Sequence, residues 1–202
     1  MPDLNWENPD VHRALEDICF FWLDKGIDGF RVDAFIHIQK EDGFPDLDLP
    51  KGEIAIAEQY YANLPKVNTY MKIFTSRLRE RFPDIFIVGE AASADVHLAR
   101  TYSDPNEGGC NSVITFRYFP VDEESKDWRL NGNMQRAPLL VDRFKETMNE
   151  WQEEMSDIGG PTLYWNNHDM ARVVSRVGDD HIYRDNSAKM LATLMYLQKG
   201  IP

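Results

Sequence analysis

The apolar residues of this chain recur with two spacings, one typical of helices and one typical of strands. Between Asn8-Pro9 and Gly26 they follow helical spacing, at Val11, Leu15, Ile18, Phe21 and Trp22. An asparagine cap, a proline at the first helical position and a terminating glycine flank this segment, which therefore predicts a helix. The next stretch, GFRVDAF at 29–35, is short and largely apolar and predicts a strand.

The same order of helix and strand repeats along the rest of the chain. Apolar spacing predicts helices at 67–78, 139–155 and 187–198, and apolar runs predict strands at 85–90, 112–118 and 162–169. The segment 91–109 is expected to be a loop with a short helical piece around 96–101. In the last helix the residues expected to face the core are Met190, Leu191, Leu194 and Leu197. Alternating elements without a linker predict an α/β fold with a parallel sheet.

Acidic residues stand at the ends of three predicted strands, namely Asp33, Glu90 and Asp169. No strand is followed by a GxGxxG or P-loop phosphate motif. Catalytic groups at the C-terminal ends of several strands are typical of a (β/α)8 barrel. Because we count four strands where a barrel has eight, and the chain ends in what reads as the approach to another strand, the pattern predicts part of a TIM barrel.

Two charges on one apolar strand require a physical reason. Arg31 and Asp33 are two residues apart, so on a strand they share a face, and buried charges either pair or serve a function. A neighbouring guanidinium favours ionised Asp33, which makes it a candidate nucleophile; the alternative is an aspartate that caps the next turn.

Glu90 ends a strand that has no polar residue before it. Burial there is expected to raise its pKa, as a general acid at neutral pH requires; the alternative is a glutamate at a helix N-terminus. One carboxylate held ionised beside one held protonated is the pattern of glycoside hydrolysis.

The run NNHD at 166–169 gathers amide, imidazole and carboxylate groups suited to sugar hydroxyls. A metal site is the rival interpretation, since carboxylates and a histidine can hold Mg²⁺, Mn²⁺ or Zn²⁺. HxH and HExxH spacings are absent, and Arg31 would repel a cation. Aromatic candidates for stacking on sugar rings, each of which could equally be core, are Phe35, Phe116, Tyr118 and Trp165.

Composition narrows the partners and the compartment. The net charge of −12 disfavours nucleic acid and anionic membranes as partners. Two cysteines outside any CxxC motif fit a reducing compartment. The first residues show no signal peptide, and no apolar run reaches the roughly 18 residues of a membrane span, so we expect a cytoplasmic protein.

The motifs together resemble the alpha-amylase superfamily of glycoside hydrolases, near its oligo-1,6-glucosidase and alpha-glucosidase branch. MPDLN at 1–5, GFRVDAF, IVGE and NNHD occur in the family's order, and the tail at 171–202 is also similar. The resemblance implies a partial (β/α)8 TIM barrel, about strands 4 to 7 with helices 3 to 7. Residues 1–202 would be a single fragment of the catalytic domain, with 1–6 ending its inserted loop domain.

The resemblance also implies roles. Asp33 would be the nucleophile, Glu90 the general acid and then base, and Asp169 the stabiliser of the transition state. Substrate-binding residues would be Arg31 and His168, with Arg172 closing the pocket. To these we add Ala34, beside the nucleophile, and the aromatic candidates Phe35 and Phe116 from the strand ends. The substrate would be an alpha-glucosidic oligosaccharide cleaved with retention. No cofactor is implied, and no metal is expected because the family's calcium site lies outside this chain.

Departures from the family bear on the substrate and on completeness. Ala34 replaces the valine typical of oligo-1,6-glucosidases, and Met170-Ala171 replaces Gln-Pro, which favours alpha-1,4 or mixed specificity. The family's first motif is absent, so we expect little activity from these residues alone and self-association through open sheet edges. Alternatives are a sucrose-acting or trehalose-phosphate-acting member, or a non-catalytic transporter subunit.

Overall fold

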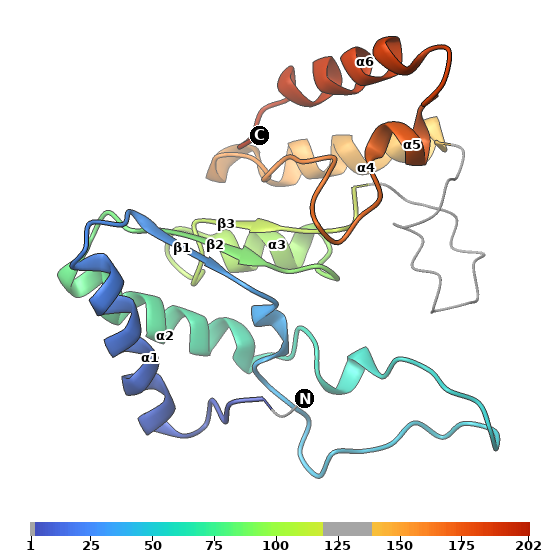
Figure 1. Ribbon diagram of the computed structural model, residues 1–202. Coiled ribbons are helices and arrows are strands. Elements are labelled where there is room, and N and C mark those ends of the chain that lie inside the picture. The colour runs from blue at the N-terminus through green and yellow to red at the C-terminus, as the bar shows by residue number, and fades with distance from the viewer. Residues whose placement is uncertain (1–2, 119–138) are drawn as a thin grey trace. The chain divides into compact units, whose positions relative to one another are not determined.

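The computed structural model describes residues 3–118 and 139–202 (Figure 1). The chain divides into two compact units, residues 1–116 and 117–202. Asp33 and Glu90 belong to the first unit, and Asp169 belongs to the second. No helix in the described ranges is long and apolar enough to cross a membrane.

A three-stranded parallel sheet organises the first unit, in the order β1 (Gly29–Val32), β2 (Phe86–Glu90) and β3 (Ser112–Ile114). The register pairs Val32 with Gly89 and Glu90 with Ile114. Because all three strands run the same way, their C-terminal ends meet at one edge. The predicted parallel α/β arrangement is confirmed, and Asp33 and Glu90 lie at the same edge of the sheet.

Three helices accompany the sheet: α1 (Pro9–Leu23), α2 (Lys66–Arg81) and α3 (Val96–Ser103). Asn8 caps α1, since its side chain accepts a hydrogen bond from the backbone N–H of Asp10. Figure 1 shows α1 and α2 packed against each other, and α3 contacts β3. All three predicted helices are confirmed, while the 3₁₀ turns η1 (Phe35–His37) and η2 (Glu58–Tyr60) were not predicted.

The apolar stripes of these helices are covered to different degrees. In α2, Val67, Met71 and Leu78 are completely buried. Ile87 of the central strand β2 is 1% exposed. By contrast, three large apolar residues of α1 remain about half exposed: Ile18 at 56%, Phe21 at 55% and Trp22 at 48%. Helix α2 is therefore a core helix, whereas only part of the apolar face of α1 is covered.

The second unit contains the helices α4 (Val141–Glu154), α5 (Val173–Val177) and α6 (Arg184–Tyr196), with the turn η4 (Ser156–Ile158). Aromatic rings build its core: Trp151 meets Tyr118 edge to face at 5.0 Å, and Trp165 meets Phe144 at 5.8 Å. Trp165 Nε1 also donates to the carbonyl of Leu191 at 2.8 Å. This hydrogen bond fixes the polar atom of a buried indole on α6.

The predicted fourth strand, TLYWNNHD at 162–169, does not form as expected. Only Thr162 pairs, through a parallel bridge to Ile201, and Leu163 donates to the carbonyl of Ile201 at 2.7 Å. A strand needs a neighbouring segment that offers backbone groups, and in the described ranges this segment meets such a partner only there. The sheet of the first unit accordingly has three strands rather than four.

Two further expectations were wrong in detail. Met190 and Leu197 do not face the core of the second unit, because they are 52% and 81% exposed, whereas Leu191 is buried. The strand predicted at 112–118 ends at Ile114, since its partner β2 ends at Glu90. Beyond that point one hydrogen bond continues, from the Phe116 N–H to the carbonyl of Ala92 at 3.0 Å.

Replacing Gly89 with alanine should destabilise the first unit. An added Cβ would lie 2.4 Å from a ring carbon of Phe35 and 2.8 Å from Cys110 Sγ. Such overpacking costs about 1–3 kcal/mol, measurable as a lower urea midpoint. Cys110→Ala opens space on one side and should restore part of the loss in the double variant. A Gly89→Ala protein as stable as the unaltered chain would contradict this packing.

Candidate active site

The guanidinium of Arg31 joins the two predicted catalytic carboxylates. Its Nη1 contacts Asp33 Oδ1 at 2.5 Å, and its Nη2 donates to Glu90 Oε2. The register explains the reach, because Arg31 pairs with Val88 on the neighbouring strand, two residues before Glu90. Sequence reasoning brought Arg31 and Asp33 together, and the structure adds Glu90. We call Asp33 and Glu90 the carboxylate pair.

The two members of the pair have different surroundings. The Asp33 side chain is 73% exposed, whereas that of Glu90 is 11% exposed. Burial raises the pKa of Glu90, and a hydrogen bond with Asp33 raises it further; Arg31 opposes the shift without cancelling it. The expected raised pKa of Glu90 is confirmed in direction. A buried carboxyl with a raised pKa beside an exposed carboxylate, both held by one guanidinium, is suited to acid catalysis next to a nucleophile.

The chain leaves β1 through an unusual backbone conformation. Ala34 has φ +41° and ψ +35°, in the left-handed region that few residues other than glycine, asparagine and aspartate adopt. The turn η1 follows at once, so Asp33 stands between a strand end and a tight turn. A strained backbone beside a candidate nucleophile is the kind of feature that functional sites retain.

The aromatic candidates of the first unit occupy different environments. Phe35 is 1% exposed, and its ring lies edge to face on Tyr102 at 5.0 Å and over the backbone of Gly89. The ring therefore supports the strand ends from inside and presents no stacking face. Phe116 is half-buried just beyond β3.

The predicted polar residues of the second unit lie in a turn before α5. His168 Nε2 is 3.3 Å from Asp169 Oδ2, and both side chains are exposed, as is Arg172 at the N-cap of α5. The preceding asparagines serve the backbone: Asn166 Oδ1 accepts from the Val173 N–H at 2.7 Å, and Asn167 Oδ1 from the Asp169 N–H at 3.0 Å. They shape the turn that presents His168 and Asp169.

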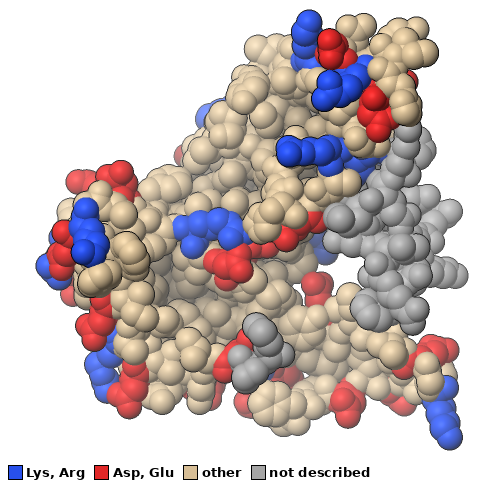
Figure 2. Space-filling view, viewed as in Figure 1, with Lys and Arg blue, Asp and Glu red and all other residues tan. Residues whose placement is uncertain are grey.

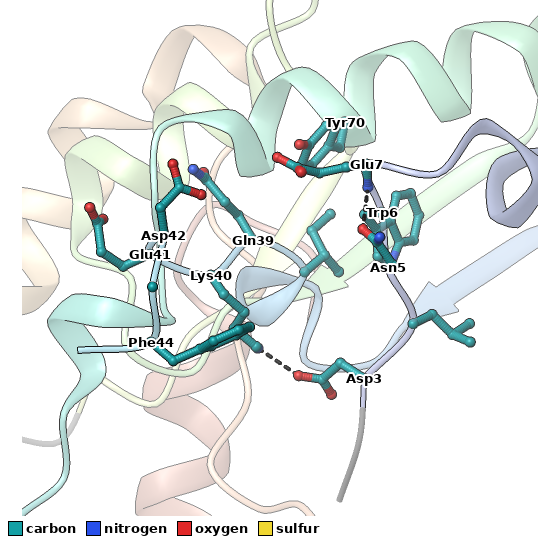
Figure 3. A pocket seen from close by; sticks show the side chains of 13 residues that line it. Asp3, Asn5, Trp6, Glu7, Gln39, Lys40, Glu41, Asp42, Phe44 and Tyr70 are labelled. Atoms are coloured by element: carbon teal, nitrogen blue, oxygen red, sulfur yellow. Dashed lines mark hydrogen bonds and ion pairs between the residues drawn. The ribbon is translucent and has the colours of Figure 1, made fainter. Parts of the chain in front are cut away.

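A separate cavity of about 570 Å³ lies elsewhere in the first unit (Figure 3). Figure 3 shows Lys40 reaching toward Asp3, and the two form an ion pair at 2.6 Å. Trp6 packs near Tyr70 on the other side, with ring centroids 6.4 Å apart. Neither member of the carboxylate pair lines this cavity.

Charges of both signs are mixed on the face of the molecule in view. On the face shown in Figure 2, acidic and basic side chains of the described residues alternate rather than gather by sign.

No group of three His, Cys, Asp or Glu side chains placed to hold a metal ion occurs within residues 3–118 and 139–202. That the chain binds no metal remains a prediction.

The carboxylate pair lies where the parallel strands end, and one arginine links its two members. Enzymes with parallel α/β folds place acid–base groups at these strand ends, and this arrangement defines the class of the protein. Residues 1–202 match, over their whole length, the family described as alpha amylase, catalytic domain. The chain belongs to this family of glycoside hydrolases.

Several relatives within the family are similar to the chain. It is 39% identical to an oligo-1,6-glucosidase of Halalkalibacterium halodurans over 202 residues, covering 100% of this chain and 35% of the relative. It is 36% identical to a trehalose-6-phosphate hydrolase of Bacillus subtilis, covering 99% and 34%. The chain thus spans about a third of the length of the curated relatives it matches.

Solved structures show the same similarity. A structure titled "Family GH13_31 enzyme" superposes with a TM-score of 0.83 at 45% identity, covering 100% of this chain and 35% of that one. A trehalulose synthase mutant superposes with a TM-score of 0.83 at 30% identity, again covering 100% and 35%.

Glu90→Gln should stabilise the chain in a pH-dependent way. Because the folded pKa of Glu90 lies above its unfolded value, the folded state binds more protons between the two, and its stability falls as pH rises through that window. The amide removes this penalty, so the melting temperature should rise at pH 8, with the gain vanishing toward about pH 4.

The matched control is Glu53→Gln, which removes the same charge from an exposed loop position. It should leave the pH dependence of the melting temperature close to that of the unaltered chain. A gain from Glu90→Gln that is equal at both pH values would contradict a raised pKa at Glu90.

Proposed function

We propose that the chain supplies the central part of the catalytic barrel of a retaining alpha-glucosidase. The substrates are short oligosaccharides with alpha-1,4 or alpha-1,6 glucosidic bonds. The observation that carries the proposal is the contact of one guanidinium, that of Arg31, with both Asp33 and Glu90. Oligo-1,6-glucosidases among the relatives support the substrate class.

In the first step the exposed carboxylate of Asp33 attacks the anomeric carbon. The bond from that carbon to the glycosidic oxygen breaks, and Glu90 gives its proton to the departing oxygen. Burial favours this role, since it raises the pKa of Glu90 and so shifts this carboxyl toward its protonated form. The products of the step are a free alcohol and a glucosyl ester of Asp33.

In the second step the ionised Glu90 takes a proton from water. The resulting hydroxide character at the water oxygen allows attack on the same anomeric carbon, which releases Asp33 as a carboxylate. Two displacements at one carbon restore the alpha configuration. Arg31 favours the carboxylate form of Asp33 at the start and end of the cycle by its direct charge contact.

The proximity of the carboxylate pair favours retention over inversion. An inverting enzyme separates its two carboxyl groups widely enough to admit a water molecule between acid, base and sugar. Asp33 and Glu90 instead contact the two terminal nitrogens of one guanidinium, which favours a closely spaced pair.

The other site residues complete the proposal. Asp169 would hold sugar hydroxyls and stabilise the transition state, with His168 and Arg172 binding the same sugar. Their exposure supports these roles, since each side chain is available to a ligand. Phe116 would contact the substrate from the edge of the sheet beyond β3.

In this proposal β1 to β3 correspond to barrel strands 4 to 6, and the segment beginning at Thr162 to strand 7. The remaining strands would come from further sequence. Residues 1–202 alone are then expected to show little or no turnover and to self-associate through the edges of β1 and β3 that no other described strand covers.

A second candidate is the hydrolysis of trehalose 6-phosphate. It is favoured by a relative of that name at 36% identity and by a structure of the Bacillus licheniformis enzyme at 35% identity with a TM-score of 0.81. A phosphorylated sugar needs a basic site, whereas the viewed face in Figure 2 mixes both signs among the described residues. Direct competition of the two substrates distinguishes these functions.

Asp33→Asn should abolish alpha-glucosidase activity. The gene product that contains this chain, with its native flanking sequence, is expected to hydrolyse p-nitrophenyl alpha-glucoside and release alpha-glucose first, as followed by proton NMR. Removing the nucleophile should lower kcat by roughly 10⁴-fold or more. Asp42→Asn, in an exposed loop, is the control and should keep activity. Release of beta-glucose, or full activity of Asp33→Asn, would refute the mechanism.

Ala34→Val should shift the preference between linkages. The resemblance associates valine after the nucleophile with alpha-1,6 cleavage, so the ratio of isomaltose to maltose hydrolysis should rise. The backbone sets a cost, because a β-branched side chain is unfavourable at φ +41° and should also lower the melting temperature. Ala34→Gly, which accepts this φ, is the control and should not raise the isomaltose ratio. An unchanged ratio of isomaltose to maltose hydrolysis in the valine variant would show that residue 34 does not determine the linkage preference.

A further inference from the structure

A half-buried amide links the segments that follow the two members of the carboxylate pair. Asn63 lies in the short loop between η2 and α2, and Ser93 lies three residues past Glu90. Asn63 Nδ2 donates to Ser93 Oγ at 3.0 Å, while Tyr102 Oη donates to Asn63 Oδ1 at 3.0 Å. One amide therefore uses both its donor and its acceptor to join the loop, the segment after β2 and α3.

The backbone of Asn63 is fixed to the Asp33 side of the site. Its N–H donates to the carbonyl of Ile36 at 2.9 Å, and Ile36 is a 1% exposed residue of η1 three positions after Asp33. Asn63 also has φ +54°, which asparagine tolerates better than most residues. An uncommon conformation persists where the surroundings determine it, as these three hydrogen bonds do.

Tyr102 closes the connection from the other direction. Its ring is 2% exposed and lies against Phe35 edge to face, and Phe35 packs on Gly89, the neighbour of Glu90. Burial raises the pKa of Tyr102, so its phenol stays an O–H donor at neutral pH. Two sets of contacts thus connect the segment after Asp33 with the segment around Glu90. One passes through Asn63 to Ser93, and the other passes through Phe35 to Gly89.

We propose that Asn63 is a positioning residue for the carboxylate pair. Its amide fixes the distance between the segment after Asp33 and the segment after Glu90, so that both carboxylates stay on the guanidinium of Arg31. The catalytic consequence rests on the proposed function, whereas the link itself rests on the contacts alone. A displacement of about 1 Å between catalytic groups can cost 10²-fold in rate, so such a link affects turnover from outside the site.

The test uses Asn63→Gly in the gene product with its native flanking sequence. Glycine accepts the left-handed backbone, so this variant removes the amide without adding strain. With p-nitrophenyl alpha-glucoside, kcat should fall about 10- to 100-fold. KM should stay within about twofold, because a residue that only positions the catalytic groups affects the transition state rather than substrate binding.

The pH profile gives a second readout. The charged groups facing Glu90 are Arg31 and Asp33; β3 presents no charged residue, and His37 of η1 faces Tyr61. Loosening the link exposes Glu90 to water, so the upper limb of the kcat profile, which reports the general acid, should move to lower pH.

Asn68→Ala is the matched control. This asparagine of α2 also uses both amide atoms, donating to the carbonyl of Glu107 at 2.9 Å and accepting from the Gly109 N–H at 3.3 Å. Its loss should lower stability while leaving kcat and the pH profile unchanged. Tyr102→Phe, which removes one O–H, should shift kcat in the same direction as Asn63→Gly and serves if the glycine variant does not fold.

A readout without activity separates this proposal from the proposed function. In urea unfolding, the midpoint shift of the Asn63→Gly, Ser93→Ala double variant should be smaller than the sum of the two single shifts. The reason is that each single substitution already removes the same hydrogen bond. Additive shifts, or an unchanged kcat and pH profile in folded Asn63→Gly, would overturn the positioning role. Absence of alpha-glucosidase activity from the unaltered protein would overturn the proposed function instead, and the additivity result would still decide the link.

Discussion

The guanidinium of Arg31 sets the geometry on which the site of the first unit depends. It is the group that holds two carboxylates of unlike exposure, Asp33 and Glu90, within one hydrogen-bonded set. Two carboxylates this close repel when both are ionised, and the charge of the arginine offsets that repulsion. The parallel register supplies the reach, since it sets Arg31 against Val88 and Val32 against Gly89. A slip by one residue would turn the arginine to the other face of the sheet.

The residues that support this arrangement are small, strained or buried rather than charged. Gly89 has no side chain where the Phe35 ring and Cys110 Sγ approach, and Ala34 takes a left-handed backbone so that the chain can turn directly after Asp33. Neither the missing side chain of Gly89 nor the left-handed backbone of Ala34 stabilises the fold by itself. Each allows neighbouring groups to pack closely at the strand ends. The first unit therefore combines a regular sheet with an irregular edge, and the chemistry lies at that edge.

Local patterns were enough to predict the helices and the positions of the carboxylates, because both depend on nearby sequence. Apolar spacing located α1 and α2, and polar residues at strand ends located Asp33 and Glu90. The segment at 162–169 was wrong as a full strand because strand formation depends on a distant partner. Phe35 could not be recognised as a supporting ring, nor Asn166 as a turn residue, since burial and backbone contacts are properties of the folded chain. Neither the division into two units nor the hydrogen bonds of Asn63 could be predicted from neighbouring residues in the sequence.

Cys110 has a consequence that concerns chemical labelling rather than catalysis. Its thiol is buried against Gly89, and burial raises its pKa to about 12, so almost none of it is thiolate at neutral pH. A thiol reagent can reach it only when the packing around it opens, so the labelling rate measures local opening in the segment beside Gly89. Cys19, only half-buried on α1, provides a second thiol in the same molecule against which that rate can be compared.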